Sequence, residues 1–401
     1  MYDAVIVGAG PAGSILAERL AQASYKVALL EEHEVVGVPR HCSGLVSPRT
    51  LVAAGIAPKE VEVARFDSAR VWSPSGRNLW LKSQTLQAIA MDRVQFDQKL
   101  AGRASRAGAE LILKARASGY EVRSDGVVLD VHIDGRRQSL LTKLLVGADG
   151  ANSRIAHQLI SHDKAAEVLP AIQSEIEFLD APIEHIEIFV GKKVAPGWFA
   201  WLIPQTGTRA LVGTGGVHGI QGAYQSTLAL VEQRFGAFTV VRTNSAPLPV
   251  SPASHFVNDR VMLVGAAARQ TKPSTGGGIY SSVRAAQIAS DTAIKALTSD
   301  DCSKAALTTY EHSWAEEAGA ELRYQQWLRW LFRHLSDNHF EMLIDVLGEA
   351  WATELISQYG DIDFSSYLFQ PLIRMLKQRY GSTKNVLPVE LDGMTERARV
   401  Y

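Results

Sequence analysis

Short apolar runs and a helical stretch follow one another at the start of the chain. The run Asp3–Val7 predicts a buried strand, and Pro11–Ala23 has the composition of a helix. Tyr25–Leu30 predicts a second strand, which ends in Glu31 and Glu32. A strand, a tight turn, a helix and a second strand form a βαβ unit. The chain therefore opens with the beginning of a parallel sheet.

The pattern changes further along the chain. Asp92–Ala107 predicts a helix, and Leu140–Val146 predicts a strand that ends at Gly147. Residues 161–251 alternate between short apolar segments and turns, which is typical of an antiparallel sheet with one exposed face. Val261–Val264 again predicts a buried strand, and a glycine cluster and an alanine-rich helix follow it. The remainder is mostly helical and rich in aromatic residues, and no internal repeat is visible.

Composition narrows the classes of function. The 401 residues are 46% hydrophobic with a formal net charge of −1, so nothing favours nucleic acid as a partner. Cys42 and Cys302 lie far apart, without the spacing of metal ligands or of a disulfide framework, which fits a reducing cytosol. No signal peptide is visible, and no stretch has the roughly 20 apolar residues of a membrane span. We expect a cytoplasmic protein without a metal site, which meets a membrane only peripherally, at its inner face.

A glycine-rich turn joins the first predicted strand to the first helix. In Gly8-Ala-Gly10-Pro-Ala-Gly13, the first glycine permits a tight turn, the second lets the backbone approach a pyrophosphate, and the third lets helix and strand pack closely. The pyrophosphate is expected at the helix N-terminus, where free N–H groups favour an anion. Glu31 can accept hydrogen bonds from an adenosine ribose, and it would repel the 2′-phosphate of NADP. A purely structural turn is the alternative, and between cofactors the motif leaves FAD and NAD open.

Three later segments bear on that choice. They are Asp92-Arg93-Val-Gln-Phe96-Asp97, Gly147-Ala-Asp149-Gly150-Ala-Asn-Ser153-Arg154, and Val264-Gly265-Ala-Ala with Thr275-Gly-Gly-Gly278-Ile279. In order and spacing they resemble the flavoprotein superfamily that includes aromatic hydroxylases and geranylgeranyl reductases. The resemblance implies FAD and a fold like that of p-hydroxybenzoate hydroxylase: a Rossmann-type α/β domain with an inserted mixed or antiparallel sheet and a helical C-terminal region.

One position departs from the superfamily pattern. The last segment normally reads Gly-Asp, and the aspartate bonds the ribityl chain, whereas this chain has Ala266 there. The loss of one charge-assisted hydrogen bond costs on the order of 1.5–3 kcal/mol, or roughly ten- to a hundredfold in FAD affinity.

Two further stretches resemble geranylgeranyl reductases in particular, above all the archaeal prenyl-lipid reductases. Pro39-Arg-His41-Cys42-Ser43-Gly44 is similar to the cysteine loop of that family, and Lys272–Ile279 fits it as well. Pro196–Pro204 resembles the family's substrate-site motif Pro-x-x-Tyr-x-Trp-x-Phe-Pro, with Phe199 in place of the tyrosine and Ile203 in place of the phenylalanine. The resemblance implies an enzyme that saturates the double bonds of polyprenyl chains with hydride from reduced flavin.

The resemblance also implies the site residues. The expected catalytic residues are Cys42, Phe199 and Trp201, although for Cys42 a structural role beside the flavin is favoured over a direct catalytic one. The expected FAD contacts are Gly8, Gly10, Ala12, Gly13, Glu31, Glu32, Cys42, Ser43, Leu45, Arg93, Ala117, Asp149, Gly265, Ala266, Gly277, Gly278 and Ile279. The aromatic residues would line an apolar tunnel and stabilise positive charge on the alkene. Because Phe199 lacks a hydroxyl, water or His41 would have to relay the proton.

We expect three parts in the chain. The FAD-binding domain is discontinuous and covers residues 1–65, 88–160 and 252–300. Residues 66–87 and 161–251 form the substrate domain, and residues 301–401 the helical region. Within the last part, Glu321–Leu347 is strongly amphipathic. It is either a helix that packs on the core with a solvated face of Arg329 and Arg333, or one that meets lipid headgroups.

Alternatives of other classes stay open. The first is a flavin-dependent monooxygenase or halogenase, because halogenases carry a Trp-x-Trp-x-Ile-Pro stretch that Phe199–Pro204 matches in part. The second is a non-catalytic protein that binds flavin or prenyl lipid. No second glycine-rich nucleotide motif is visible. The electron donor of a reductase would therefore be NAD(P)H bound transiently, or a ferredoxin-like protein.

Overall fold

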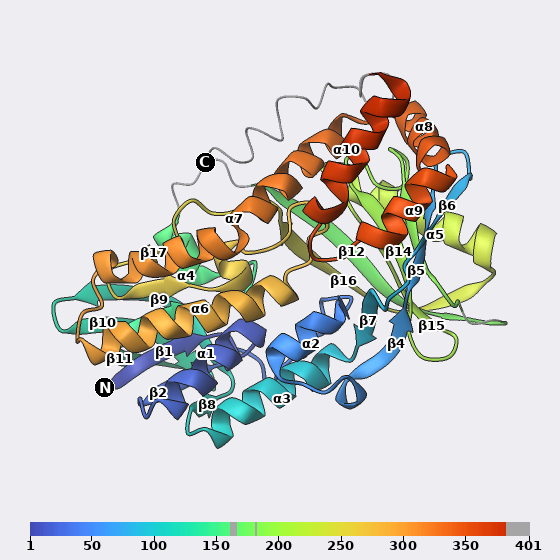
Figure 1. The fold of residues 1–401 in the computed structure, drawn as a ribbon. Helices are drawn as coiled ribbons and strands as arrows, with labels where there is room; N and C mark the ends of the chain where they lie inside the picture. Colours follow the sequence, from blue (N-terminus) through green and yellow to red (C-terminus); the bar gives the residue numbers. More distant parts are fainter. Residues whose placement is uncertain (161–166, 181–182, 382–401) are drawn as a thin grey trace.

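The computed structural model describes residues 1–160, 167–180 and 183–381 (Figure 1). A first sheet has the strand order β17-β18-β11-β1-β2-β8, and β9 and β10 extend it from β11. Its strands are β1 Tyr2–Val7, β2 Val27–Leu30, β8 Glu110–Ile112, β9 Ala115–Arg123, β10 Gly126–Ile133, β11 Arg136–Gly147, β17 Val257–Asn258 and β18 Val261–Leu263.

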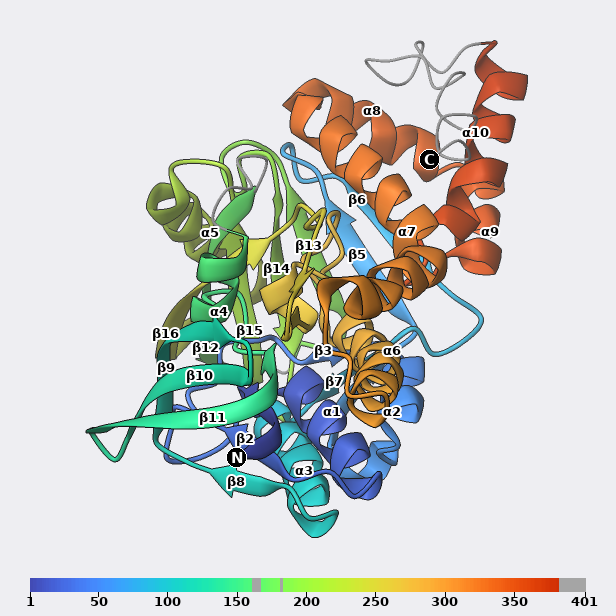
Figure 2. The same cartoon turned by 90° about the vertical axis from the view of Figure 1, so that its left-hand side faces the viewer.

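The centre of this sheet is parallel and buried. β1 runs parallel to both β11 and β2, and every residue of β2 is buried. Helices α1 (Pro11–Gln22), α3 (Arg93–Arg106) and α6 (Ile279–Thr298) pack together on one side, and β9 and β10 lie on the other (Figure 2). Since both faces are covered, the strands are continuous apolar runs rather than alternating ones.

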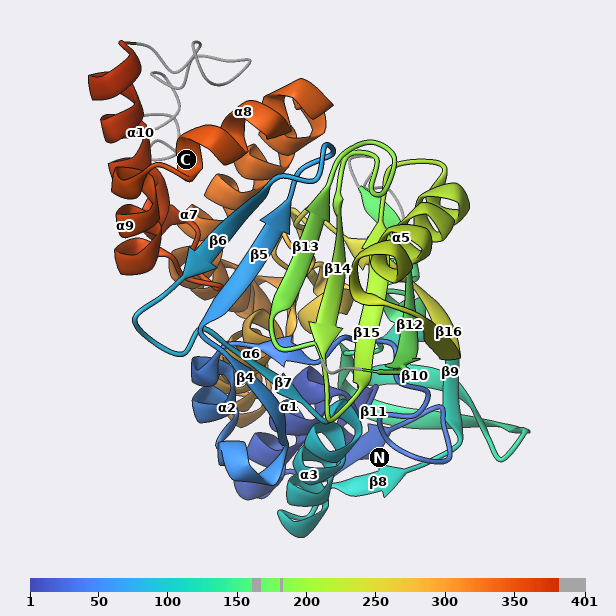
Figure 3. The ribbon, with the colours of Figure 1, turned by 90° about the vertical axis from the view of Figure 1, so that its right-hand side faces the viewer.

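A second sheet of seven strands has the order β16-β12-β15-β14-β13-β5-β6 (Figure 3). Its strands are β5 Ser68–Trp72, β6 Asn78–Lys82, β12 Val168–Phe178, β13 Ile186–Val190, β14 Phe199–Pro204, β15 Arg209–Gly215 and β16 Phe238–Pro249. The pairs are antiparallel except β13 with β5, which is parallel. Helix α5 (Ile220–Phe235) packs on β15 and β12.

Shorter elements connect the two large sheets. They are the three-stranded sheet of β3 (Leu45–Val46), β7 (Ala88–Met91) and β4 (Glu62–Phe66), helices α2 (Pro48–Ala54) and α4 (Arg154–Leu159), and 3₁₀ turns η1 (Pro58–Glu60) and η2 (Gly265–Ala268). The domain boundaries expected above stay a prediction. Residues 161–166, 181–182 and 382–401, which fall in the expected substrate domain and helical region, lie outside the described residues.

The C-terminal helices correct one expectation. They are α7 Lys304–His334, α8 Asp337–Leu347, α9 Ala350–Tyr359 and α10 Ser366–Tyr380. The prediction of a single amphipathic helix over Glu321–Leu347 is wrong. Helix α7 ends before Leu335, and a separate helix, α8, follows. Ser336 accepts a hydrogen bond from the His339 N–H and caps α8, which explains the break.

The prediction that Arg329 lies on a solvated face of α7 is wrong. That side chain is only 4% exposed, its Nη2 lies 2.9 Å from Glu167, and its guanidinium covers the Trp198 ring at 4.8 Å. Arg333 is more exposed but pairs with the same carboxylate, at 3.2 Å. Arg329 therefore belongs to the packed interior and cannot meet a lipid headgroup outside. None of the helices in the described ranges is long and apolar enough to cross a membrane.

The helix cap at Asp92 offers a test of local stability. Its carboxylate accepts hydrogen bonds from the Val94 N–H at 3.0 Å and the Gln95 N–H at 3.1 Å at the start of α3. We expect Asp92→Ala to lower the free energy of unfolding by about 1 kcal/mol, because these donors lose their partner. Asp92→Asn keeps a side-chain oxygen as acceptor and should lower the free energy of unfolding by only a few tenths of a kcal/mol. Equilibrium urea unfolding measures both; equal losses would contradict the capping role.

Candidate functional site

A cavity of about 870 Å³ lies between the first and the second sheet. Its walls come from the turn after β1, the loop before β3, the start of α3, the turn after β11, and the loop before α6, while β12, β13 and β14 close it from the second sheet. Sites for small molecules and cofactors typically occupy about 300–1,000 Å³. Among the residues that the structure describes, no cluster of His, Cys, Asp or Glu could hold a metal ion.

The structure brings together nearly all of the predicted site residues. Those that line the cavity are Gly8, Gly10, Ala12, Glu31, Glu32, Cys42, Ser43, Leu45, Arg93, Ala117, Asp149, Phe199, Trp201, Ala266, Gly277, Gly278 and Ile279. The two that do not are Gly13 and Gly265, which pack behind the wall. A shared cavity does not by itself test the role of each residue.

The glycine turn has the geometry that a pyrophosphate needs. Gly8 has a φ of +101°, and a Cβ there would overlap the backbone of Ala148. A Cβ at Gly13 would overlap the carbonyl oxygen of Gly8, so this glycine lets α1 pack on the turn. Gly10, in contrast, faces open space within 4 Å and lines the cavity. The first N–H groups of α1 are therefore open to an anion, as FAD binding requires.

Glu31 is held at the end of β2 by three contacts. Its Oε2 accepts a hydrogen bond from the Ala9 N–H at 3.2 Å, and its Oε1 accepts one from the His33 N–H at 3.1 Å. The same Oε1 lies 2.6 Å from His33 Nδ1. Glu31 is 8% exposed and still reaches the cavity wall, so its carboxylate is positioned before any ligand binds. Its neighbour Glu32 is half-exposed at the cavity edge.

Cys42 lies beside a buried ion pair. Its sulfur accepts a hydrogen bond from the Gly44 N–H at 3.5 Å. Arg93 bonds both oxygens of Asp97, at 2.9 and 2.7 Å, and also contacts Cys42. Burial works to lower the pKa of Arg93, but the negative charge of Asp97 and the nearby Cys42 outweigh it and raise that pKa above its ordinary value. The cavity thus has a charged guanidinium, paired with the Asp97 carboxylate, next to its one lining thiol.

Asp149 supports its own loop. Its carboxylate accepts hydrogen bonds from Ser153 Oγ at 2.5 Å and from the Arg154 N–H at 2.8 Å, which hold the start of α4. Burial raises the pKa of Asp149 above its usual range.

The turn at Ala266 is held by Gln270, whose Oε1 accepts a hydrogen bond from the Gly265 N–H at 2.7 Å. Gln270 thus supports this turn, in which residue 266 is an alanine.

Aromatic residues of β14 form the wall on the second sheet. The Phe199 and Trp201 ring centroids lie 6.0 Å apart at 63°, and the Trp201 indole N–H donates to Gln173 Oε1 at 3.0 Å. Trp198 stacks on Phe199 from the far side at 5.0 Å. Apolar side chains complete this part of the wall: Ile186, Ile188, Ile203 and Leu248. One end of the cavity is thus polar and the other apolar.

Sequence reasoning missed an ion pair at the cavity. Lys272 Nζ donates to Asp363 Oδ1 at 3.0 Å and to the Ile362 carbonyl at 2.7 Å, and all three residues line the cavity. Lys272 lies inside a loop that the sequence singled out. Asp363 could not be found, because it lies between two C-terminal helices and only the tertiary fold brings it to that loop.

Two glycine substitutions separate packing from ligand binding. We expect Gly10→Ala to leave the thermal stability of the apoprotein unchanged and to weaken FAD binding about tenfold, because its methyl group enters open cavity space. Gly13→Ala should destabilise the apoprotein by about 1–3 kcal/mol, because its Cβ overlaps backbone. Calorimetry and FAD titration measure both effects, and the reverse pattern would contradict the roles given to the two glycines.

Comparison with known proteins agrees with this geometry. Residues 1–199 match the FAD binding domain family. The chain is 30% identical over 362 residues to digeranylgeranylglycerophospholipid reductase 2 of Methanopyrus kandleri, covering 86% of this chain and 90% of that protein.

Two solved structures share the fold. A geranylgeranyl bacteriochlorophyll reductase-like protein from Thermoplasma acidophilum has a TM-score of 0.81 and 22% identity, over 94% of this chain and 98% of its own. A flavin-dependent brominase has a TM-score of 0.71 and 17% identity, over 95% of this chain and 100% of its own. The predicted fold class and the FAD cofactor are confirmed. With a dinucleotide turn and an aromatic wall in one cavity, this chain belongs to the digeranylgeranylglycerophospholipid reductase family of FAD-dependent oxidoreductases.

Proposed function

We propose that this protein saturates the isolated double bonds of geranylgeranyl chains on a membrane lipid. The observation that carries the proposal is the two-sided cavity, in which the glycine turn of α1 and the aromatic wall of β14 face the same space. The name of the Methanopyrus kandleri relative gives the lipid class. When bound, FAD supplies the hydride. Gly10 and the N-terminus of α1 would hold its pyrophosphate, Glu31 its ribose, and Arg93 the flavin end.

The aromatic wall has two tasks in this chemistry. It excludes water from an alkene that has no polar handle, and its faces can stabilise positive charge that develops when the alkene is protonated. Phe199 and Trp201 are partly buried and reach the cavity with their rings, which suits both tasks. Phe199 brings no hydroxyl group, so a proton must come from water or from another group at the wall.

Cys42 is the group we propose to position or deliver that proton. Its sulfur is fixed by the Gly44 N–H and lies against the positive charge of Arg93. Both contacts hold the sulfur at the cavity wall beside a charged group, which supports a role for Cys42 beyond packing. His41 also lines the cavity and is the alternative donor, either directly or through water.

The oxygenase alternative has a weaker basis. The brominase shares the fold at 17% identity, and fold likeness carries no chemistry of its own. The reductase relatives match in sequence over most of the chain. Membership of a family of reductases likewise disfavours a non-catalytic binding protein.

We further propose that the electrons come from NAD(P)H bound transiently or from a ferredoxin-like protein. The protein would work at the cytoplasmic side and touch the membrane peripherally to reach its substrate. Trp330 on α7 and Tyr367 on α10, which are 40% and 55% exposed, support such a contact, because amphipathic rings favour the lipid interface.

An anaerobic half-reaction tests the proposed function. Holoprotein is reduced with dithionite and mixed with a digeranylgeranylglycerol phospholipid, while flavin absorbance and lipid mass are followed. We expect the flavin to reoxidise and the lipid to gain about two hydrogens per double bond, because hydride and proton add across it. A flavin that stays reduced until air is admitted would contradict lipid reduction and favour oxygen chemistry.

Substitution at Trp201 tests the role of the aromatic face. We expect Trp201→Leu to lower kcat about thirtyfold, because a cation–π contact in a desolvated site is worth roughly 2 kcal/mol. Trp201→Phe keeps an aromatic face and should retain most of kcat. FAD titration of both variants serves as the control, since Trp201 lies at the apolar end of the cavity. Equal losses of kcat in the two variants would show that the ring face does not matter.

A further inference from the structure

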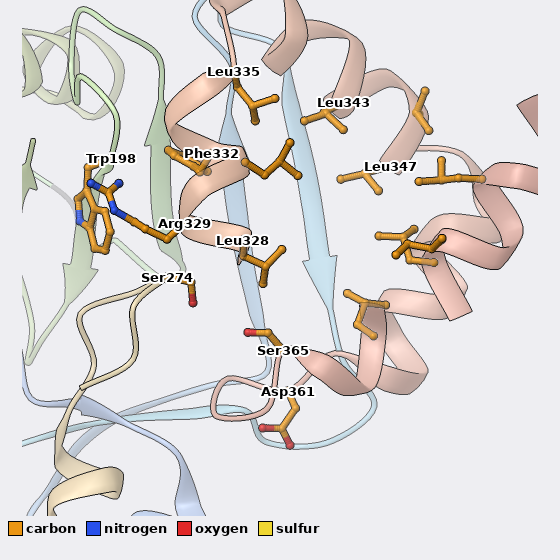
Figure 4. A pocket seen from close by; sticks show the side chains of 16 residues that line it. Trp198, Ser274, Leu328, Arg329, Phe332, Leu335, Leu343, Leu347, Asp361 and Ser365 are labelled. Atoms are coloured by element: carbon orange, nitrogen blue, oxygen red, sulfur yellow. The ribbon is translucent and has the colours of Figure 1, made fainter. Parts of the chain in front are cut away.

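A second cavity, of about 400 Å³, lies among the C-terminal helices; we name it the helical cavity (Figure 4). Most of its wall is aliphatic. The apolar side chains come from α7, α8, α10 and the residue that follows α7: Leu328, Leu331, Phe332, Leu335, Leu343, Val346, Leu347, Leu368, Leu372, Ile373 and Leu376. A wall of this kind favours a hydrocarbon and offers little to a polar ligand.

The helical cavity shares a thin wall with the cavity of about 870 Å³ between the two large sheets, which we name the flavin cavity. Trp198 lines the helical cavity and stacks on Phe199, which lines the flavin cavity. Ser274 faces the helical cavity, and the next residue, Thr275, faces the flavin cavity. Likewise, Asp361 lines the helical cavity and the next residue, Ile362, lines the flavin cavity. In three places, therefore, one residue lines the helical cavity and the next residue in the sequence lines the flavin cavity.

The end nearest this wall is the polar end of the helical cavity. Figure 4 shows Arg329, Trp198 and Ser274 together at one side, with the leucines of α7 and α8 extending away from them. Arg329 uses its terminal nitrogens on the Gly197 carbonyl and on Glu167. Its Nε is buried and has no hydrogen-bond partner within the described residues. A buried donor without a partner is costly, so this end of the cavity has polar groups in an otherwise apolar wall.

We infer that the helical cavity binds the second hydrocarbon chain of a two-chain lipid while the first chain lies along Phe199 and Trp201. The oxygen-bearing backbone that joins the two chains would lie near Arg329 and Ser274, where the polar end meets the thin wall. This inference rests on the proposed function, because it takes the substrate to be a lipid with two chains. It explains why an apolar cavity with one polar end lies directly beside the reaction site: a chain left in water would oppose binding.

A filled cavity provides the test. Leu343→Trp places a large ring in the helical cavity, and Asn338→Trp adds the same ring on an exposed position of the same helix. The holoenzyme variants are assayed on a digeranylgeranylglycerol phospholipid and on single-chain geranylgeraniol. We expect Leu343→Trp to lower the ratio of kcat/KM for the two-chain lipid to that for geranylgeraniol by at least about tenfold. This is the effect of leaving about two methylene groups unburied. Asn338→Trp should leave the ratio as in the unsubstituted protein.

The outcomes separate the inference from the function on which it rests. If Leu343→Trp lowers both activities equally, or neither, the helical cavity is structural and the inference is wrong. If the unsubstituted protein reduces neither compound, the proposed function fails. The inference is then decided by photo-crosslinking, which needs no turnover and no variant. A two-chain lipid with a diazirine on one chain should label Asp337–Leu347 or Ser366–Tyr380. Labelling confined to other parts of the chain would overturn it.

Discussion

The close approach of three backbone segments at the glycine turn determines the rest of the arrangement. Hydrogen alone fits at Gly8 and Gly13, so β1, the start of α1 and the turn after β11 can converge. Their convergence places the carboxyl ends of the parallel strands and the N-terminus of α1 at one cavity. The polar half of the site follows from this packing, before any ligand contributes.

The apolar half depends on a second constraint, because the sheet that carries Trp201 must face the glycine turn at a fixed distance. The loop before α6 connects the parts. Lys272 in that loop pairs with Asp363. Two residues before Asp363, Asp361 accepts a hydrogen bond from Arg49 of α2 at 2.6 Å. Both acids belong to the segment between α9 and α10. The C-terminal helices thereby close the cavity that the first two sheets leave open, and bring their own apolar cavity beside it.

The sequence predicted the parts of the site that depend on local chemistry. A glycine turn after a strand, or an acid at the end of the next one, needs only neighbouring residues to be recognised, and both lie where they were expected. Arg329 was predicted wrongly for the opposite reason. Its helical period is that of a solvated face, yet Glu167 and Trp198 cover it from distant parts of the chain. The pairing of Lys272 with Asp363 and the helical cavity are likewise products of tertiary packing, which no local pattern encodes.

If FAD and a prenyl chain share one cavity, the absorbance of the flavin itself reports the binding of the lipid. Oxidised holoprotein would be titrated with a digeranylgeranylglycerol phospholipid while calorimetry records binding. We expect a saturable change in the flavin spectrum with the same midpoint as the heat of binding, because an apolar chain would replace water beside the flavin. Binding heat without any change in the flavin spectrum would place the lipid at a site away from the flavin, so the two would not share one cavity.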